Sequence, residues 1–450
     1  MANRKLIWGL VAALFIAAPG FAQVQKGSIT VTVVDADGAA LPGATVSAEA
    51  PDALTRRSAV SDEQGAVDLP ALDPSGKYSV TVELEGFGPA KAENVGVRAG
   101  QNSAVRVALT IAAVTESINV TALQSRVWSV DVRNLKPTMQ RNLAHVTKLI
   151  DYAQGSGAEW GGERLWGAKQ DLICMHEFPI QGFQPWTRKE LNQVAFELPG
   201  PEIDVIAQRA KKYGCYIAFG CYAKEKDWPD HVINMSVIVG PEGTIVSKQW
   251  KSRNILGLFG EGALIGTTTY DVLDRYVEMY GWDATLPIAR TDIGNIAITA
   301  VGAEPMLYTC LAMKGAEIMI LTVTGGTNAD SAIATARANR LYTVGVGNSV
   351  SPDNPGFMEG AGSRDEGTVV IDPRGTVLAK TANHHEDGCS ARVPIADFRK
   401  TRRLPEFPMA LMLPVFQQYE PVFKPNAFLE KLPATYQESG ELVRKRMSGK

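Results

Sequence analysis

Two charged side chains stand where apolar, strand-like runs of the chain end. Glu177 closes the run DLICMHE, and Lys251 follows a hairpin-like stretch that turns at PEG. A carboxylate at a strand end can take and return a proton, and a fixed cation can stabilise negative charge that develops during a reaction. Taken alone, the two could also be a solvated carboxylate and a surface lysine, and Lys248 or Arg253 could be confused with Lys251.

We expect no metal ion at the histidines. His384 and His385 are adjacent in the loop NHHEDG, but no third ligand is in view, so solvent around them is favoured. His176 directly precedes Glu177. It could donate a hydrogen bond into a pocket or be a packed histidine, and both alternatives stay open.

The five cysteines have no framework spacing. Cys174, Cys215 and Cys221 lie in apolar strand-like runs, so we expect them to be buried small hydrophobic residues. Because the number is odd, at least one thiol is free or paired between chains.

Composition and charge bound the class of protein. With 450 residues, two or three folded units are expected. Hydrophobic residues make up 45% and charged residues 21%, which is ordinary for a globular protein with real cores. A formal net charge of -3 gives no case for a nucleic-acid partner, which would require a basic patch.

Residues 1–22 have the pattern of a cleavable signal peptide. Arg4 and Lys5 precede an apolar run over 6–18, and small residues lead to a cleavage site after Ala22. The run is short for a membrane span, and an uncleaved anchor is the alternative. We therefore expect an exported protein, either periplasmic or secreted.

Residues 23–114 predict an all-β domain. Short alternating runs such as SITVTVVD and KYSVTVELEGF are separated by Gly, Pro, Asp and Asn, which is typical of a small β-sandwich. Over about 27–112 the pattern resembles the carboxypeptidase regulatory-like domain, a transthyretin-like sandwich. That resemblance implies a scaffold or adhesion module that could bind a partner in the cell envelope. A polar stretch over 115–126 is expected to be a linker.

Beyond this stretch the sequence pattern predicts strands that alternate with helices. The helical run EIDVIAQRAKKYG separates the strand-like runs DLICMHE and CYIAFGCYA, which predicts an α/β layer architecture. From about Met235 the spacing changes to hairpins, so a mixed sheet is expected. Residues 401–450 form a Pro- and aromatic-rich C-terminal extension, which we expect to wrap over this domain or over a neighbouring subunit.

Seven landmarks follow one another along residues of about 127–400: NLAHVTKLIDYA, DLICMHEFPIQGF, INMSVIVGPEGTIVSKQWK, TDIGNIAI, CLAMKGAEIMIL, ARANRLYTVGVGNS and GTVVIDPRGTVLAK. In these landmarks and in their order the second unit resembles the nitrilase (carbon–nitrogen hydrolase) superfamily, and AMKGAE is especially like the aliphatic amidase branch. The resemblance implies a nitrilase-type α-β-β-α sandwich, a homodimer or higher homo-oligomer, and no organic cofactor or metal. As an activity it implies hydrolysis of a non-peptide C–N bond in a small amide or nitrile-like compound.

The resemblance also implies roles for four residues. Glu177 matches the general base, which takes the proton of a thiol nucleophile and later activates water. Lys251 matches the lysine that stabilises the oxyanion. Glu261 in FGEGAL matches a second carboxylate that positions substrate. His176 replaces the proline usual before this glutamate and is a further candidate for binding substrate.

The family's nucleophile is missing. Its members attack with a cysteine thiolate, but no cysteine stands between Gly294 and Pro305. Counting forward along the strand TDIGNIAI places the nucleophile at Val301, and counting back from the following helix places it at Thr299. Cys310 lies inside that predicted helix and should not reach the pocket.

Several interpretations of the missing nucleophile stay open. The chain could be a hydrolase of small amides that uses Thr299, a rescued cysteine or a water molecule activated by Glu177. It could instead be a non-catalytic protein that binds a small molecule or serves as a structural or interaction protein of the cell envelope. An error in the sequence at this turn is a residual alternative.

Overall fold

The computed structural model divides into two compact units, the first holding residues 1–81 and 91–108 and the second residues 82–90 and 109–450. The predicted signal peptide lies outside the described residues. The structure describes residues 26–50, 56–74, 77–84, 87–110, 117–155, 166–254, 262–301, 304–324, 329–349, 367–404 and 406–448.

The first unit consists of two β-sheets. In β1 (Gly27–Val34) alternate residues are buried, among them Ile29, Val31 and Val33, because one face of the strand packs on a core. The all-β sandwich predicted for this part of the chain is confirmed. One sheet has the order β4-β1-β7 and the other β3-β2-β5-β6, with strands β2 (Thr45–Glu49), β3 (Arg57–Val60), β4 (Ala66–Leu72), β5 (Lys77–Glu83), β6 (Ala90–Gly96) and β7 (Asn102–Ala108).

The second unit contains two larger sheets, and both are mixed, as predicted. In the first sheet β8, β9 and β11 are parallel while β12, β13 and β20 are antiparallel to their neighbours. Its order is β13-β12-β11-β9-β8-β20, with strands β8 (Ile118–Gln124), β9 (Leu172–Met175), β11 (Tyr216–Lys224), β12 (Ile233–Val239), β13 (Ile245–Trp250) and β20 (Asp387–Val393), and the short β10 (Phe196–Glu197) pairs with β11.

The second sheet runs β14-β15-β16-β17-β18-β19. Its central strands β15, β16 and β17 are parallel. The strands are β14 (Ala289–Thr291), β15 (Gly294–Thr299), β16 (Ile318–Thr322), β17 (Tyr342–Val346), β18 (Val369–Ile371) and β19 (Val377–Lys380).

Ten α-helices accompany these sheets in the described part of the chain. They are α1 (Leu135–Ala153), α2 (Arg188–Val194), α3 (Pro201–Tyr213), α4 (Leu273–Tyr280), α5 (Pro305–Met313), α6 (Ala329–Asn339), α7 (Ile395–Thr401), α8 (Met409–Gln418), α9 (Ala427–Glu430) and α10 (Tyr436–Met447).

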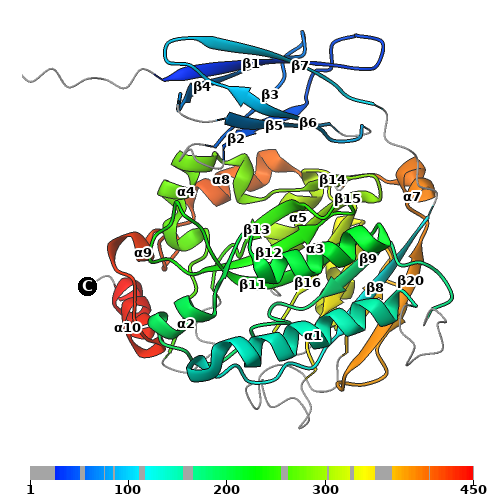
Figure 1. Cartoon of the computed structure of the whole chain (residues 1–450), viewed down its shortest axis with the longest axis vertical. Coiled ribbons are helices and arrows are strands. Elements are labelled where there is room, and N and C mark those ends of the chain that lie inside the picture. The colour runs from blue at the N-terminus through cyan, green and yellow to red at the C-terminus, as the bar shows by residue number, and fades with distance from the viewer. Residues whose placement is uncertain are drawn as a thin grey trace, which may run out of the picture. The chain divides into compact units, whose positions relative to one another are not determined.

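In the part of the second unit that the structure describes, three apolar cores lie against the sheets and helices drawn in Figure 1. Side chains of β8, β9 and β11 meet those of β15, β16 and β17 in a core between the two sheets. The opposite face of the first sheet packs on α1 and α3. The opposite face of the second sheet packs on α5 and α6. The predicted α-β-β-α sandwich is therefore confirmed.

One boundary prediction is wrong. Residues 115–126 were expected to be a linker, but most of that range is β8, which pairs with β9 and β20 in the interior of the first sheet. The polar residues that suggest a linker are hydrogen-bonded inside the fold. Asn119 donates to the carbonyl oxygen of Lys169 at 2.9 Å, Thr121 bonds Gln170, and Gln124 donates to the carbonyl oxygen of His385 at 2.6 Å.

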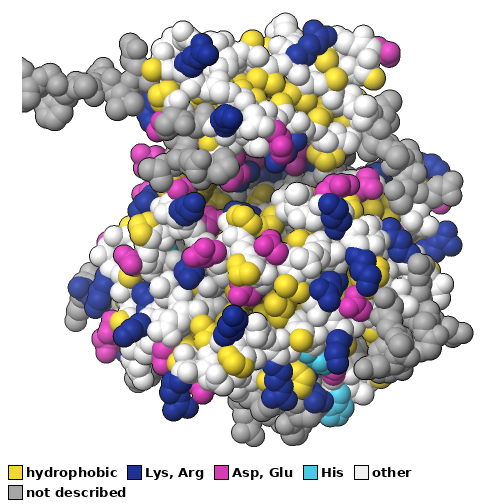
Figure 2. Space-filling model, viewed as in Figure 1, with side chains coloured by type: hydrophobic (Ala, Val, Ile, Leu, Met, Phe, Trp, Pro, Cys, Tyr) yellow, Lys and Arg dark blue, Asp and Glu magenta, His cyan; other side chains and the backbone are white. Residues whose placement is uncertain are grey.

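The C-terminal extension packs on the second unit through its last two helices. Ala427 and Phe428 of α9 are buried in the apolar core that also contains residues of α1 and α3. Among the described residues no helix has the length and apolar character needed to cross a membrane. On the face shown in Figure 2, lysine and arginine side chains are interspersed with acidic ones rather than gathered in one patch.

Candidate functional site

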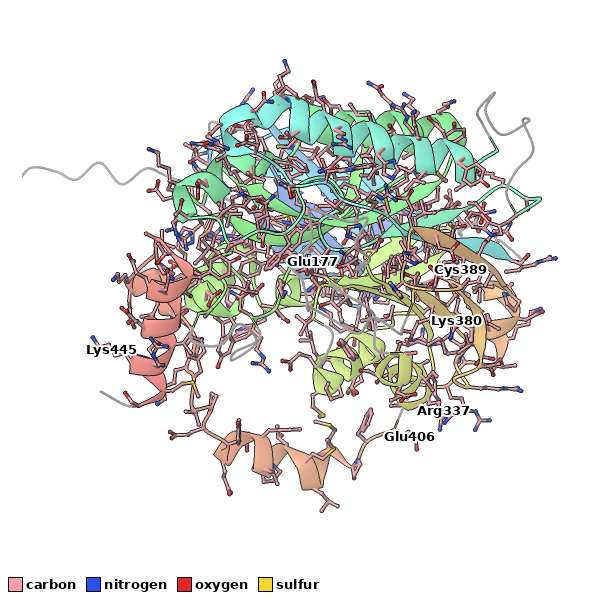
Figure 3. The ribbon with its side chains drawn as sticks, turned by 90° about the horizontal axis from the view of Figure 1, so that it is seen from below. Glu177, Arg337, Lys380, Cys389, Glu406 and Lys445 are labelled. Carbon is pink, nitrogen blue, oxygen red and sulfur yellow. The ribbon has the colours of Figure 1, made fainter. Side chains whose placement is uncertain are left out.

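Glu177 lies in the interior, two residues beyond the end of β9 (Figure 3). The whole residue is only 4% exposed. Its Oε1 accepts hydrogen bonds from Lys251 Nζ and Asn234 Nδ2, both at 2.9 Å. Its Oε2 accepts a hydrogen bond from the Thr324 hydroxyl. The carboxylate therefore has three donors around it and a cation in direct contact.

The donors come from different strands, which is why they meet only in the folded chain. Asn234 lies near the start of β12, and Lys251 directly follows β13, the partner of β12 in the hairpin. The Lys251 backbone N–H donates to the Asn234 carbonyl oxygen at 2.8 Å. Thr324 lies two residues beyond β16 of the other sheet. Glu177 thus connects the two sheets.

A second polar contact crosses between the sheets close by. The hydroxyl groups of Ser236 on β12 and Thr322 on β16 lie 3.2 Å apart. Thr322 also donates to the Thr299 carbonyl oxygen at 3.3 Å. These hydrogen bonds therefore connect the middle of β12 with the ends of β15 and β16.

The Glu177–Lys251 pair is an almost completely buried ion pair. The Lys251 side chain is 6% exposed and that of Glu177 is 5% exposed. Removing two such charges from water costs several kcal/mol for each, and their attraction offsets that cost only when further hydrogen bonds saturate the groups. Here Asn234 and Thr324 supply those bonds. The arrangement offers a proton acceptor next to a fixed cation.

One atom of the site has no partner among the described residues. The side-chain oxygen of Asn234 is buried and accepts no hydrogen bond there, although the amide nitrogen of the same side chain donates to Glu177. A buried acceptor without a donor is costly and rare in native proteins. A ligand with an N–H group would supply the missing donor.

Gly220 on β11 allows the backbone of Glu177 to approach. The Gly220 N–H donates to the His176 carbonyl oxygen at 3.1 Å. A Cβ atom at position 220 would lie 2.3 Å from the Glu177 carbonyl oxygen and 2.8 Å from its Cα atom. Any side chain at Gly220 would therefore displace the backbone that carries the carboxylate.

His176 is a packed residue in this structure. Its Nε2 lies 2.8 Å from the Ser125 hydroxyl, and both residues are buried. Burial lowers the pKa of His176 from its ordinary value of 6.5 to about 3, although a hydrogen bond to Ser125 acts in the opposite direction. His176 is therefore neutral near pH 7. Its predicted contact with substrate stays a prediction.

The depressed pKa of His176 predicts acid sensitivity. Below pH 6.5 the unfolded chain binds a proton at this histidine and the folded chain does not, so stability is complete at higher pH and falls as the pH decreases. Between pH 7 and pH 5 the wild type should lose about 2 kcal/mol more of its free energy of unfolding than His176→Gln. Urea unfolding at both pH values measures this, and equal losses in the two proteins would contradict it.

The hydroxyl group of Thr299 is not brought to Glu177 in the described structure. In the parallel pairing of β15 and β16, Thr299 lies beside Leu321, which belongs to the core under α5 and α6. Side chains in register on neighbouring strands share a face, so the Thr299 side chain points to that helical side. Its hydroxyl oxygen accepts a hydrogen bond from the Val301 N–H at 3.4 Å.

The cysteine thiols are likewise not placed as nucleophiles at Glu177. All five cysteines are free, and four of them are buried, as expected for Cys174, Cys215 and Cys221. Burial raises the pKa of Cys215 to about 11 and that of Cys221 to about 12, so neither is an activated nucleophile. Cys310 lies on α5, as predicted from the sequence, and is exposed. Glu261 lies outside the described residues.

Sequence reasoning missed Asn234 and Thr324, and it missed an aromatic group next to Glu177. Tyr222 stacks on Phe178 with ring centroids 4.2 Å apart. The pKa of both Tyr222 and Tyr436 is raised, mainly by burial and in part by the negative charge of Glu177. Tyr436 begins α10, so the C-terminal extension contributes to the surroundings of the carboxylate.

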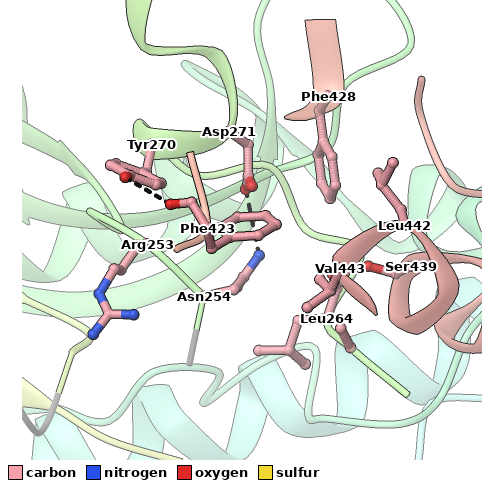
Figure 4. A pocket seen from close by; sticks show the side chains of 11 residues that line it. Arg253, Asn254, Leu264, Tyr270, Asp271, Phe423, Phe428, Ser439, Leu442 and Val443 are labelled. Atoms are coloured by element: carbon pink, nitrogen blue, oxygen red, sulfur yellow. Dashed lines mark hydrogen bonds between the residues drawn. The ribbon is translucent and has the colours of Figure 1, made fainter. Parts of the chain in front are cut away.

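A small cavity, shown in Figure 4, is lined in part by Arg253 and Asn254, and neither Lys251 nor Glu177 is among its lining residues. The Lys251 carbonyl oxygen accepts from the Thr269 N–H at 3.0 Å, and the next residues of that segment reach the cavity wall. In its wall, burial raises the pKa of Asp271 to about 6. The lining residues are Arg253, Asn254, Ala263, Leu264, Tyr270, Asp271, Phe423, Phe428, Ser439, Leu442 and Val443.

The double sheet and its buried Glu–Lys pair define a class of protein. The family model for carbon–nitrogen hydrolases matches residues 120–403, and the chain belongs to this family. The model for the carboxypeptidase regulatory-like domain matches residues 28–110. The suspected membership of the nitrilase superfamily and the N-terminal regulatory-like domain are thus confirmed.

Among individual proteins, the chain is similar to a bifunctional nitrilase/nitrile hydratase, NIT4A, of Lupinus angustifolius. Identity is 24% over 239 residues, which are 48% of this chain and 61% of the relative. The chain therefore spans about three fifths of the length of that curated protein.

Solved structures of the superfamily are also similar. Nit3 of Saccharomyces cerevisiae, a member of branch 10 of the nitrilase superfamily, is 17% identical with a TM-score of 0.47, and the match covers 65% of this chain and 97% of that one. A double mutant of the amidase from Nesterenkonia sp. AN1 in complex with acrylamide is 14% identical with a TM-score of 0.45, covering 67% and 98%.

Proposed function

We propose that the second unit binds a small amide or a related carbonyl compound at Glu177 and Lys251, and that it does so without the thioester chemistry of its family. The observation that carries this proposal is the buried ion pair beside the unpaired Asn234 oxygen, with no thiol among its described contacts. In this proposal the ligand carbonyl oxygen faces Lys251 and the ligand N–H donates to Asn234.

The energetic argument supports use of the site. Replacing a buried ion pair by well-packed apolar residues is often neutral or stabilising. A chain that needed only a stable fold could therefore do without Glu177 and Lys251. Asn234 and Thr324 supply hydrogen bonds to the Glu177 carboxylate, although the chain lacks the nucleophilic cysteine that Glu177 and Lys251 would otherwise serve. A ligand that binds at Glu177 and Lys251 would explain why both charges are present.

A second candidate function is hydrolysis without a covalent intermediate. Glu177 would take a proton from a water molecule as that water attacks the ligand carbonyl carbon, while Lys251 stabilises the oxyanion. The contact between Glu177 and Lys251 favours this route over attack by Thr299, because the Thr299 side chain points to the helical side of its sheet.

One experiment separates the two. Purified protein is mixed with a panel of small amides and nitriles, nitriles being included because the lupin relative is named for them, and both thermal stabilisation and ammonia release are measured. The proposal predicts that the amides, which carry both a carbonyl oxygen and an N–H group, stabilise the wild type without ammonia release, and that neither effect occurs with Glu177→Gln. Glu225→Gln is the matched control, because Glu225 pairs at 3.0 Å with Lys248, which lies on β13 just before Lys251. Ammonia that disappears only in Glu177→Gln would instead establish the hydrolase.

The same panel tests the role of Asn234. A matched ester lacks the N–H of an amide and leaves the buried Asn234 oxygen unpaired, which costs about 1–3 kcal/mol. The amide should therefore bind roughly 10-fold more tightly, or better, than the ester of equal size. Equal affinities would contradict the assigned contact.

We further propose that the protein is exported and assembles with a second copy of itself. The signal-peptide pattern over 1–22 supports export to the periplasm or the medium. An uncovered apolar stripe on α5, made of Met306, Cys310 and Met313, supports a homo-oligomer through helices of the second unit. The first unit would bind a partner in the cell envelope, and the interspersed surface charge gives no support to a nucleic-acid partner.

A further inference from the structure

An aromatic cluster begins at the residue that follows Glu177. Phe178 stacks on Tyr222 of β11 with ring centroids 4.2 Å apart, and Phe183 stacks on Phe178 at 6.0 Å. Trp186 lies edge to face with Tyr222 at 6.3 Å. Each of these four aromatic residues is at most 5% exposed. The buried carboxylate of Glu177 therefore adjoins an aromatic region of the interior, which is suited to the apolar part of a ligand.

Tyr222 also stands in one row with the polar groups of the site. It is the register partner of Asn234 in the pairing of β11 with β12, and the Lys251 N–H donates to the Asn234 carbonyl oxygen. Register partners place their side chains on the same face of a sheet. A Cβ atom built on Gly266 would lie 3.1 Å from Cε1 of Tyr222 and 3.6 Å from Cβ of Asn234, so the two side chains are neighbours. Because adjacent strands lie about 4.7–4.9 Å apart, the row from Lys251 to Tyr222 spans roughly 10 Å.

Gln181 fixes the place of Tyr222 in this row. Gln181 Oε1 accepts a hydrogen bond from the Tyr222 N–H at 2.9 Å, and Gln181 Nε2 donates to the Tyr222 carbonyl oxygen at 2.7 Å. Gln181 is completely buried in the segment that follows Glu177. The backbone of Tyr222 is thus tied to the segment of the carboxylate, and stacking on Phe178 orients its ring.

Tyr222 brings a polar group to the aromatic cluster. The residue is 3% exposed, and its hydroxyl forms no hydrogen bond with any residue in the described part of the chain. A tyrosine hydroxyl removed from water normally finds a partner, because an unpaired polar group is costly to bury. Burial raises the pKa of Tyr222, and Tyr436 and the negative charge of Glu177 add to that effect. The hydroxyl therefore keeps its proton near pH 7 and can donate a hydrogen bond.

We propose that Tyr222 binds the ligand of this site and selects secondary amides whose N-substituent carries a neutral hydrogen-bond acceptor. This inference rests on the function proposed above, because it keeps the ligand carbonyl oxygen at Lys251 and the N–H at Asn234. Along the row Lys251 donates, the unpaired Asn234 oxygen accepts and the Tyr222 hydroxyl donates. The matching ligand presents a carbonyl oxygen, an amide N–H and then an acceptor beyond the nitrogen, in the same order.

The charges around Tyr222 select a neutral acceptor rather than a carboxylate. Glu177 already places a negative charge in this part of the interior, and Lys251 is paired with it at 2.9 Å. A carboxylate on the ligand would be buried beside Glu177 without a cation of its own, which is costly. An ether or carbonyl oxygen accepts a hydrogen bond from the Tyr222 hydroxyl without that cost.

The test compares ligands that differ in one atom, by isothermal titration calorimetry with the full chain. N-(2-methoxyethyl)acetamide and N-(3-methoxypropyl)acetamide are each paired with N-butylacetamide or N-pentylacetamide, in which a CH2 group replaces the ether oxygen. We expect at least one ether to bind the wild type roughly 5-fold more tightly than its alkyl partner, or better. In Tyr222→Phe this preference should disappear, while the alkyl amides bind as before because the ring remains.

Two controls separate ligand binding from a structural role. Tyr342→Phe removes the hydroxyl of another buried tyrosine, at the start of β17 and so at the end of the sheet opposite Thr324, and should leave every affinity unchanged. Tyr222→Phe should unfold in urea like the wild type, because the group that it removes has no described partner. A clear loss of stability would show that the hydroxyl is bonded within the protein and would overturn the proposal.

The remaining outcomes also overturn it and say what holds instead. An equal preference for the ethers in wild type and Tyr222→Phe, or no preference in the wild type, refutes the role of Tyr222. Weaker binding of both members of a pair in Tyr222→Phe assigns the hydroxyl to the shape of the site alone. If unsubstituted amides bind through Glu177 but none of these secondary amides does, the proposed function stands and this inference fails. If no amide of either kind binds, both fail.

Discussion

Replacing Lys251 by methionine is expected to lower the free energy of unfolding by about 3–5 kcal/mol. The methionine has a similar length and packs in the same place, but it leaves the Glu177 carboxylate buried without its cation. Asn234 and Thr324 would remain as hydrogen-bond donors and cannot replace the charge. The loss arises because a charge removed from water keeps its desolvation penalty when its partner is taken away.

Equilibrium unfolding in urea measures this loss of stability. Two further variants test whether it arises from the unpaired Glu177 charge. Lys251→Met combined with Glu177→Gln removes both charges, so the double variant should be more stable than Lys251→Met alone. Lys248→Met, on β13 just before Lys251, breaks the more exposed pair with Glu225 and should cost less than about 1 kcal/mol. Wild-type stability in Lys251→Met would show that the pair is accessible to water.

Gly220→Ala should disturb the site without touching any of its side chains. The new Cβ atom would overlap the Glu177 backbone, so β9 and β11 must separate or the Glu177 segment must move. Overpacking of this kind costs about 1–3 kcal/mol. We also expect the thermal stabilisation by amides to disappear, because the carboxylate would no longer lie 2.9 Å from Lys251.

The matched control for this change is Gly96→Ala. Position 96 lies at the end of β6 in the first unit, and a Cβ atom built there meets nothing within 4 Å. This variant should unfold like the wild type and respond to ligand like the wild type. If Gly220→Ala behaved in the same way, the close approach of Gly220 to Glu177 would be wrong.

Most of the architecture could be predicted because burial follows the period of each element. In β1 every second residue is buried, and the sequence shows the same alternation. In β11 and β12 nearly every residue is buried on both faces, which gives the continuous apolar runs that indicate a covered sheet. The strand β8 was not predicted because its polar residues Asn119, Thr121 and Gln124 form hydrogen bonds with residues far along the chain. The local sequence shows only that these residues are polar and does not show which residues they bond.

Site residues that belong to a recognisable sequence motif could be predicted, whereas those that only the fold brings together could not. Glu177 and Lys251 stand in recognisable runs, and the structure places the two side chains in contact. Asn234 and Thr324 have no motif, since an amide on β12 and a hydroxyl beyond β16 become neighbours only when two sheets stack. The direction of the Thr299 side chain depends on the register of β15 against β16, which no count along the sequence fixes.

The place of β8 in the first sheet has a consequence for synthesis of the chain. β8 is the first strand of the second unit to leave the ribosome, yet its antiparallel neighbour is β20, at 387–393. The sheet stays open along that edge until nearly the whole unit has been made. The seven strands that the structure describes in the first unit, in contrast, have been made before β8 appears. Domains generally fold as units during translation, so the first can close early, whereas an emerging second unit exposes an unpaired strand edge that a chaperone or export factor would have to shield.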